Sequence, residues 1–258
     1  MQIGISTASL YPQQPTESAL INIAALGCRQ AEVFLQTRRE YRTAYVRKLS
    51  RLAANLGVVI PSLHAASSQY EPMLFYSYRR QILDGFDTLN RVLAAAAELG
   101  AGCLVFHGPL RVEHPDRARI LHRLRMVAAT AAAWGIKLAL ENVSWCLGWS
   151  PQIFRWLQRE AIPNLYYTFD SKQALRSGFA PGEYLAAMAE GLSNVHLSDG
   201  NGGIPQEGCL DGIAALLEAR GYNGPVILEA YGTRVENLAH LVRGWEAVKK
   251  AFPKKTGA

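Results

Sequence analysis

The stretch Ile136–Trp145, IKLALENVSW, joins a short apolar run directly to a carboxylate. Ile136, Leu138 and Leu140, with an alanine between the two leucines, are typical of a parallel strand covered on both faces. Glu141 and Asn142 then follow without a break. A carboxylate at the end of a buried run is costly unless a group at that end stabilises negative charge. The stretch therefore predicts a buried strand whose carboxyl end faces such a group.

Seven similar runs occur along the chain, and segments with helical periodicity lie between them. Glycines at the expected C-terminal ends of several helices support this division. Eight strand–helix units in about 250 residues match the size of a TIM barrel, and no glycine-rich phosphate-binding motif follows the first run. The sequence thus predicts an α/β fold, a single-domain (β/α)8 TIM barrel over residues 1–252, with a C-terminal tail at 253–258. The eight predicted strands are Ile3–Ser6, Ala31–Leu35, Val58–His64, Cys103–His107, Ile136–Glu141, Tyr166–Asp170, Asn194–Asp199 and Pro225–Ala230.

Composition restricts the class of protein further. Aliphatic, aromatic and cysteine residues make up 49% of the chain, enough for a large core, and the formal net charge is +6. Such a charge suits an anionic substrate or nucleic acid, but equally suits solvated helix faces. No apolar run approaches the roughly 20 residues of a membrane span, and no cationic leader opens the chain. The four cysteines have no CxxC spacing and suit a reducing compartment, so we expect a cytoplasmic protein without membrane partners.

Six of the eight predicted strands carry a potential metal ligand at their carboxyl end. The active site of a TIM barrel gathers at these ends. Several carboxylates brought together without a cation would repel one another. A divalent ion removes that conflict, and mixed nitrogen and oxygen ligands suit Zn²⁺, Mn²⁺, Co²⁺ or Fe²⁺. The residues concerned are His64, His107, Glu141, Asp170, His196 and Glu229.

The strand ends SLHAAS, VFHGP, LALENVSW, YYTFDSKQA, NVHLSDG and VILEAY resemble those of the xylose-isomerase-like TIM barrels over nearly the whole chain. The resemblance implies that Glu141, Asp170, His196 and Glu229 bind one divalent metal, namely Mn, Zn, Co or Mg. It also implies that Glu141 and Glu229 are catalytic and approach the substrate carbon from opposite sides. His64 and His107 then either bind substrate or, with Glu141, hold a second metal.

Departures from the family separate its branches. The resemblance to endonuclease IV implies a third zinc site with a histidine three residues after Asp170, where this chain has Gln173. It also implies a histidine in the loop after strand seven, which here has none. Sugar epimerases often have a histidine at the Gln173 position too, and an arginine soon after His196, which is missing here. We therefore expect the metal-binding residues of the family with a different substrate-binding surface.

The function predicted from this resemblance is that of a divalent-metal-dependent sugar or sugar-phosphate isomerase or epimerase, with proton transfer through a metal-stabilised enediolate. The partner would be a small sugar or sugar phosphate and not nucleic acid. The alternatives are an endonuclease IV-like phosphodiesterase or abasic-site nuclease, a dehydratase of the same superfamily, and a non-catalytic binding barrel.

Further residues near the strand ends are candidates for substrate binding. They are Lys172, Gln173, Asn142, Trp145 and Asp199, with Arg38 and Arg79 as possible anion ligands and Trp149 and Tyr231 as possible sugar-stacking rings. Each has an ordinary alternative as a surface cation or a packed loop residue. The segment SSQYEPMLFYSYRR (67–80) predicts either a lid over the barrel mouth or the interface of a homo-oligomer.

Overall fold

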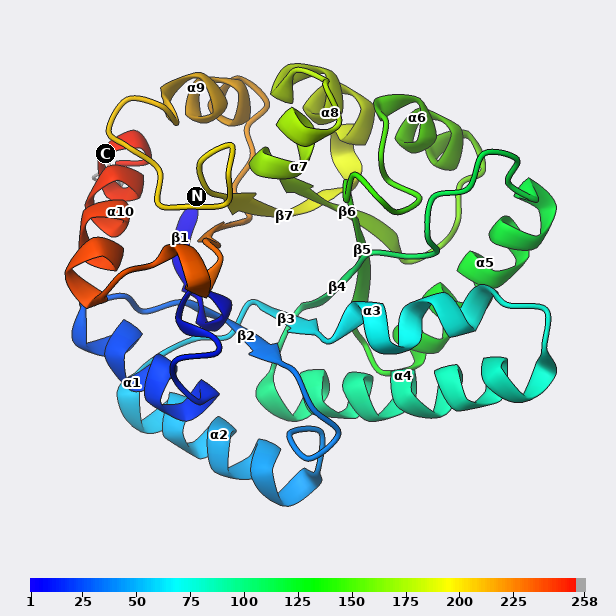
Figure 1. The fold of residues 1–258 in the computed structure, drawn as a ribbon, viewed down its shortest axis with the longest axis horizontal. Helices are drawn as coiled ribbons and strands as arrows, with labels where there is room; N and C mark the ends of the chain where they lie inside the picture. The colour runs from blue at the N-terminus through cyan, green and yellow to red at the C-terminus, as the bar shows by residue number, and fades with distance from the viewer. Residues whose placement is uncertain (254–258) are drawn as a thin grey trace.

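Eight parallel strands form a closed barrel in sequence order in the computed structural model, which describes residues 1–253. The helices surround this barrel, and the view of Figure 1 looks into it. The single-domain TIM barrel predicted from the sequence is therefore confirmed. All but the first residue of the predicted tail lie outside the described part of the chain. The strands are β1 (Gln2–Ser6), β2 (Ala31–Leu35), β3 (Ser62–Ala65), β4 (Cys103–Phe106), β5 (Lys137–Glu141), β6 (Leu165–Asp170), β7 (Leu192–Leu197) and β8 (Pro225–Leu228).

Closure depends on pairing between the first and last strands. β1 pairs with β8 from Gln2 opposite Pro225 to Ile5 opposite Leu228, and both strands run in the same direction. Since every strand has a parallel neighbour on each side, all eight carboxyl ends open at the same mouth.

The helices pack their apolar faces on the barrel and end where the sequence predicts. Five helices are followed within two residues by a glycine whose φ lies between +63° and +74°, the left-handed region that glycine tolerates. These are glycines 27, 57, 100, 135 and 221. The α-helices are α1 (Thr16–Ala25), α2 (Thr43–Leu56), α3 (Ser67–Tyr70), α4 (Arg79–Leu99), α5 (Arg117–Ala133), α6 (Pro151–Arg159), α7 (Ser171–Arg176), α8 (Pro181–Met188), α9 (Asp211–Ala219) and α10 (Leu238–Ala251). Short 3-10 helices are η1 (Thr7–Leu10), η2 (Glu71–Phe75), η3 (Ala189–Gly191) and η4 (Gly232–Arg234). Among the described residues, no helix is long and apolar enough to cross a membrane.

Four predicted strand boundaries were wrong by two or more residues, and one has a simple cause. The third strand was predicted to begin at Val58 but begins at Ser62. Pro61 has no backbone N–H and interrupts the ladder, so the preceding segment makes only an isolated bridge between Val59 and Gln30. β7 begins at Leu192 and ends at Leu197, each two residues earlier than predicted, and β8 ends at Leu228, also two residues early.

Candidate metal centre

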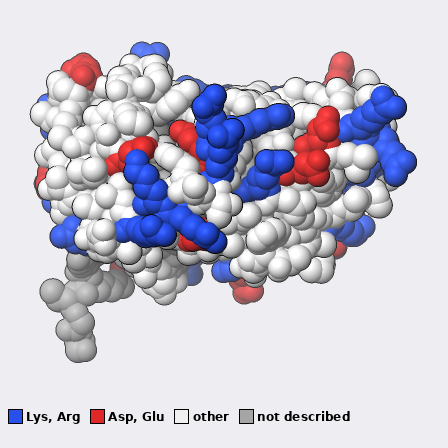
Figure 2. Space-filling view, turned by 90° about the horizontal axis from the view of Figure 1, so that it is seen from below, with Lys and Arg blue, Asp and Glu red and all other residues white. Residues whose placement is uncertain are grey.

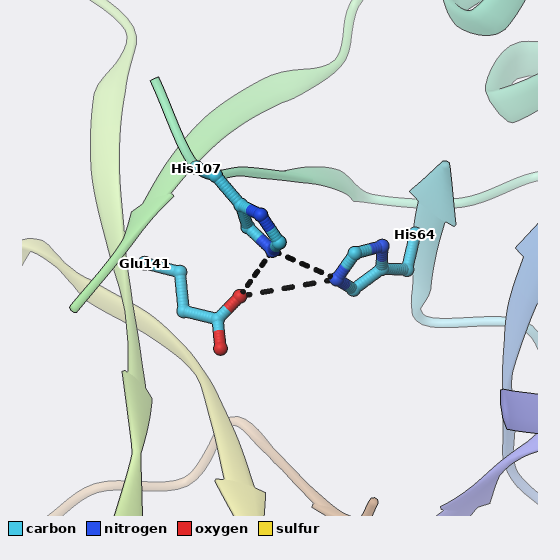
Figure 3. A group of neighbouring side chains, drawn as sticks. All are labelled: His64, His107 and Glu141. Carbon is cyan, nitrogen blue, oxygen red and sulfur yellow. Dashed lines mark hydrogen bonds and ion pairs between the residues drawn. The ribbon is translucent and has the colours of Figure 1, made fainter. Parts of the chain in front are cut away.

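His64, His107 and Glu141 meet at the barrel mouth from three successive strands (Figure 3). His107 Nε2 lies 3.0 Å from Glu141 Oε2 and 3.2 Å from His64 Nε2. His64 Nδ1 is 2.9 Å from the carbonyl oxygen of Ala65, to which it donates when it carries the ring proton. That tautomer leaves the lone pair of His64 Nε2 directed at the other two residues, which is the arrangement of a nitrogen ligand.

A second group shares Glu141 with the first. Glu141, Asp170, His196 and Glu229 each offer one ligand atom, and these atoms all lie within 4.8 Å of one another. His196 Nδ1 is 3.2 Å from Glu229 Oε2 and 3.7 Å from Glu141 Oε1. All four side chains are buried. The structure thus brings together all six residues that the sequence predicts as ligands, in two overlapping groups.

Glu32 on β2, which the sequence analysis did not select, fixes the orientation of His196. Its Oε2 lies 2.9 Å from His196 Nε2 and accepts hydrogen bonds from Ser62 Oγ at 2.6 Å and Asn194 Nδ2 at 3.1 Å. A histidine that donates one ring N–H to a carboxylate presents its other nitrogen as a ligand. One feature of the sequence indicates a special role for Glu32, because it is a carboxylate inside the otherwise apolar strand AEVFL.

The donor set fits a divalent cation. When neutral His196 donates Nε2–H to Glu32, the lone pair of its Nδ1 faces the Glu229 carboxylate, and either a proton on Nδ1 or a cation bound by both groups removes this conflict. His196 Nδ1 and Glu141 Oε2 are both buried without a hydrogen bond of normal geometry, although each lies close to a charged neighbour. One imidazole and three carboxylates are common ligands of Mn²⁺, Zn²⁺ and Co²⁺.

The pKa shifts of His196 and Glu141 also indicate a site that favours positive charge. Burial would lower the pKa of His196, but the Glu229 and Glu32 carboxylates raise it well above its usual range. Burial would raise the pKa of Glu141, but the adjacent imidazole of His107 holds it well below the usual range. The centre therefore keeps Glu141 ionised and favours positive charge beside it.

Glu32→Gln should weaken metal binding by about 10- to 100-fold, the usual loss when the partner of a ligand histidine is removed. The amide keeps a similar shape but removes the charge that orients His196. Titration calorimetry of the metal-free protein with Mn²⁺ and Zn²⁺ measures the effect. Ser62→Ala is the matched control, because it removes one hydrogen bond to Glu32 and leaves the carboxylate. Equal losses in both variants would contradict this role of Glu32.

Lys172 is the one lysine or arginine buried among the described residues, and it lies inside the second group. Its Nζ donates to Glu229 Oε2 at 2.9 Å and also to Asp170 Oδ2. Burial would lower the pKa of Lys172, but the Asp170 and Glu229 carboxylates raise it well above the usual range. Lys172 was a candidate for substrate binding with a surface cation as the alternative, and the structure pairs its buried charge with two of the expected metal ligands.

A cavity of about 430 Å³ opens at this mouth. Its wall includes four of the six expected ligands together with Lys172 and Gln173, and four aromatic rings. Gln173 Oε1 accepts hydrogen bonds from the backbone N–H of Ser144 at 3.2 Å and from Ser144 Oγ at 3.0 Å. The ligands on the wall are His64, His107, Glu141 and Glu229, and the aromatic residues are Tyr11, Phe34, Trp145 and Tyr231.

Several of the candidate substrate-binding residues lie outside the cavity wall. Asn142 is buried and joins two strand ends, since its Nδ2 donates to the Asp170 carbonyl and its Oδ1 accepts from the Asp170 N–H. Asp199 Oδ1 accepts from the N–H groups of residues 201 and 203 and so shapes its own turn. Trp149 stacks under the guanidinium of Arg111 at 3.7 Å. Arg38 and Arg79 are exposed and are also absent from the wall.

The 67–80 segment contributes no residue to the cavity wall, which argues against a lid in this conformation. It forms α3 and η2, with Leu74 and Phe75 buried. Glu71 accepts hydrogen bonds from the backbone N–H groups of His107 at 2.7 Å and Gly108 at 2.9 Å. Burial raises the pKa of Glu71 to about 7. The segment therefore supports the end of β4 from outside, and an oligomer interface there stays a prediction.

Solved structures with this architecture include several sugar epimerases. An L-ribulose 3-epimerase superposes with a TM-score of 0.81 at 19% identity, covering 96% of this chain and 93% of that one. A D-psicose 3-epimerase, determined in the presence of D-fructose, gives 0.80 at 16% identity over 97% and 98% of the two chains. A 3-keto-D-glucoside 4-epimerase from E. coli gives 0.79 at 18% identity over the same shares. At these identities the likeness establishes the fold.

Sequence comparison finds relatives of similar length. An uncharacterised protein of Mycobacterium leprae (strain TN) is 26% identical over 267 aligned positions, covering 92% of this chain and 91% of the relative. One of Mycobacterium tuberculosis (strain ATCC 25618 / H37Rv) is 26% identical over 260, covering 89% and 88%. The family model described as xylose isomerase-like TIM barrel matches residues 20–251. The chain belongs to the xylose isomerase-like TIM barrel family.

Proposed function

We propose that the protein is a divalent-metal-dependent isomerase or epimerase of a small sugar. The observation that carries the proposal is that two glutamates, Glu141 and Glu229, both line the 430 Å³ cavity and belong to one buried group of potential ligands. A reaction that moves a proton at carbon needs a base and an acid beside the same atom, and these two side chains provide both.

The residues divide the chemistry between them. A divalent ion, when bound, supplies positive charge that stabilises negative charge developing on the substrate oxygens. Glu141 and Glu229 have ligand atoms within 4.8 Å of each other on the cavity wall. The ionised glutamate removes the proton from carbon, and the other, which must first carry a proton from solvent, returns one to carbon and is left ionised. His64 and His107 lie beside Glu141 and orient a substrate hydroxyl or carbonyl by hydrogen bonding.

The cavity wall suits a neutral sugar. Rings of Tyr11, Phe34, Trp145 and Tyr231 line it, and aromatic faces pack well against the C–H faces of sugars. Lys172 is the one lysine or arginine among the described residues of the wall, and two carboxylates already neutralise it. We favour an unphosphorylated substrate because the wall carries four aromatic rings and, among its described residues, no lysine or arginine besides Lys172. Two of the similar epimerases are named for psicose and ribulose, which are unphosphorylated sugars.

A phosphodiesterase is the alternative function, because two-metal sites serve phosphodiester hydrolysis. Glu141 belongs to both groups of potential ligands, and His64 and His107 lie beside it. On the side of the barrel that carries α2 and α4, basic side chains cover more of the surface than acidic ones do, as Figure 2 shows. That face lies at the side of the barrel and not at its mouth, so its charge gives little support for phosphodiester chemistry at the candidate metal centre. Ion pairs such as Arg47 with Glu98 at 3.6 Å and Lys48 with Glu17 at 3.5 Å neutralise part of the charge.

A substrate panel tests the proposal. The metal-free protein, reloaded separately with Mn²⁺, Co²⁺, Zn²⁺ or Mg²⁺, is incubated with ketoses, aldoses, inososes and their phosphates, and the products are separated by chromatography. We expect metal-dependent interconversion of an unphosphorylated ketose and its isomer or epimer. Loss of water from an inosose would indicate a dehydratase. Cleavage of an abasic duplex, with no sugar converted, would contradict the proposal and support the nuclease.

A further inference from the structure

The positively charged side chain of Lys172 lies among residues that are expected to bind a divalent cation, where a fixed positive charge is unusual. Its ammonium contacts Asp170 and Glu229, which are two of the four residues of the second group. The side chain is 2% exposed and reaches the group from the first turn of α7, two residues after Asp170. The pairing is therefore a built feature of the β6–α7 junction and not a chance surface contact.

The local charge balance explains why the ammonium stays there. Three carboxylates of the group are buried together, those of Glu141, Asp170 and Glu229. Without a metal ion, Lys172 neutralises part of this charge. A divalent ion bound by the same oxygens would meet the ammonium at contact distance, and like charges that close repel strongly in a buried site.

Lys172 also has a second position within reach. It lies on the wall of the cavity, and its Nζ is already 5.3 Å from the centre of the Tyr231 ring. An ammonium that leaves the carboxylates can move toward this ring, which attracts cations and already has the Arg176 guanidinium 5.3 Å from its centre. The long, flexible lysine side chain permits such a movement without a change in the backbone.

We propose that Lys172 is a tethered cation that competes with the divalent metal for Asp170 and Glu229. The lysine occupies the carboxylates in the metal-free protein and is displaced into the cavity when metal binds. It therefore lowers metal affinity and stabilises the metal-free state. The inference rests on the metal site of the proposed function and does not depend on which sugar is converted.

Lys172→Met tests the competition, because methionine keeps an unbranched apolar side chain and removes the charge. Titration calorimetry with Mn²⁺ and Zn²⁺ should show affinity about 5- to 150-fold higher than in the unsubstituted protein, the usual range for coupling between two ligands. The melting temperature of the metal-free variant should fall and should recover when metal is added. Lys137→Met, at the exposed start of β5, is the control and should change neither quantity.

Equal or weaker metal affinity in Lys172→Met would overturn the proposal, and a fall in melting temperature alone would show only a structural ion pair. A measurement on the unsubstituted protein covers the case in which the variant does not fold. Reductive methylation of lysines, followed by peptide mass spectrometry, should label Lys172 more with Mn²⁺ than with chelator, while Lys137 is unchanged. Unchanged or lower labelling of Lys172 would contradict displacement. If affinity rises in Lys172→Met while no sugar is converted by any form, the competition stands and the proposed function fails.

Discussion

Glu141→Gln should lower the rate of sugar interconversion by about 10²–10⁴-fold, the range for losing a general acid or base. The glutamate lies where the two groups of ligands overlap, 3.0 Å from His107 Nε2 and 3.7 Å from His196 Nδ1. The amide removes a base and one negative charge from the metal centre at once. Steady-state kinetics at saturating metal measure the change, and metal affinity is measured separately so that the two causes can be distinguished.

Glu98→Gln is the matched control for this variant. Glu98 lies on α4 and makes a surface ion pair with Arg47 at 3.6 Å, with 37% of its side chain exposed. The same chemical change there should leave both rate and metal affinity unaltered. A Glu141→Gln protein that binds metal normally and keeps most of its activity would contradict a catalytic role for Glu141.

Asp170→Asn should reduce metal affinity by at least about 100-fold, because it removes a charged ligand of a divalent ion, and mixed carboxylate sites depend on that charge. The fold should survive. Asp170 also begins α7, where its Oδ1 accepts a hydrogen bond from the Gln173 N–H at 2.9 Å. Asparagine keeps an oxygen for this N-cap, but it removes one charged partner of the buried Lys172, so the metal-free protein should also melt at a lower temperature. Titration calorimetry and thermal melting, each with and without chelator, separate binding from stability.

Asp170→Ala gives the comparison, since it loses both the ligand and the N-cap. It should be less stable than Asp170→Asn by about 0.5–2 kcal/mol, the usual value of an N-cap. The account would be wrong if Asp170→Asn failed to fold even with excess metal, or if it bound metal as tightly as the unsubstituted protein.

The barrel itself could be predicted because each strand is marked locally. The apolar run before Glu141 is bounded by Gly135 and by the carboxylate, and the structure places β5 at Lys137–Glu141. The parallel arrangement then brings all strand ends to one mouth. For this reason, single residues such as His64 and Glu229, far apart in sequence, were predicted to meet, and they do line one cavity.

The partners of the ligands could not be predicted in the same way. Glu32 lies 164 positions before His196, and their contact depends on where β2 and β7 face each other across the barrel. Lys172 follows Asp170 closely, but its direction depends on the turn from β6 into α7. From the sequence alone, a lysine near a strand end can equally point into solvent, bind substrate or pair with a carboxylate. Packing across the barrel decides among them. The sequence can mark a charged residue inside an apolar strand, as it does for Glu32, but not the residue that it contacts.

Deuterium exchange tests the central claim, that a metal-loaded pair of glutamates moves a proton at a substrate carbon. The metal-loaded protein is incubated in deuterated water with the ketose that it converts, and the sugar is analysed by proton NMR. We predict that deuterium replaces hydrogen at one carbon next to the carbonyl, that exchange stops with chelator, and that Glu229→Gln no longer forms the product sugar. Conversion of the sugar without any deuterium at carbon, or product formation that continues in Glu229→Gln, would contradict the account.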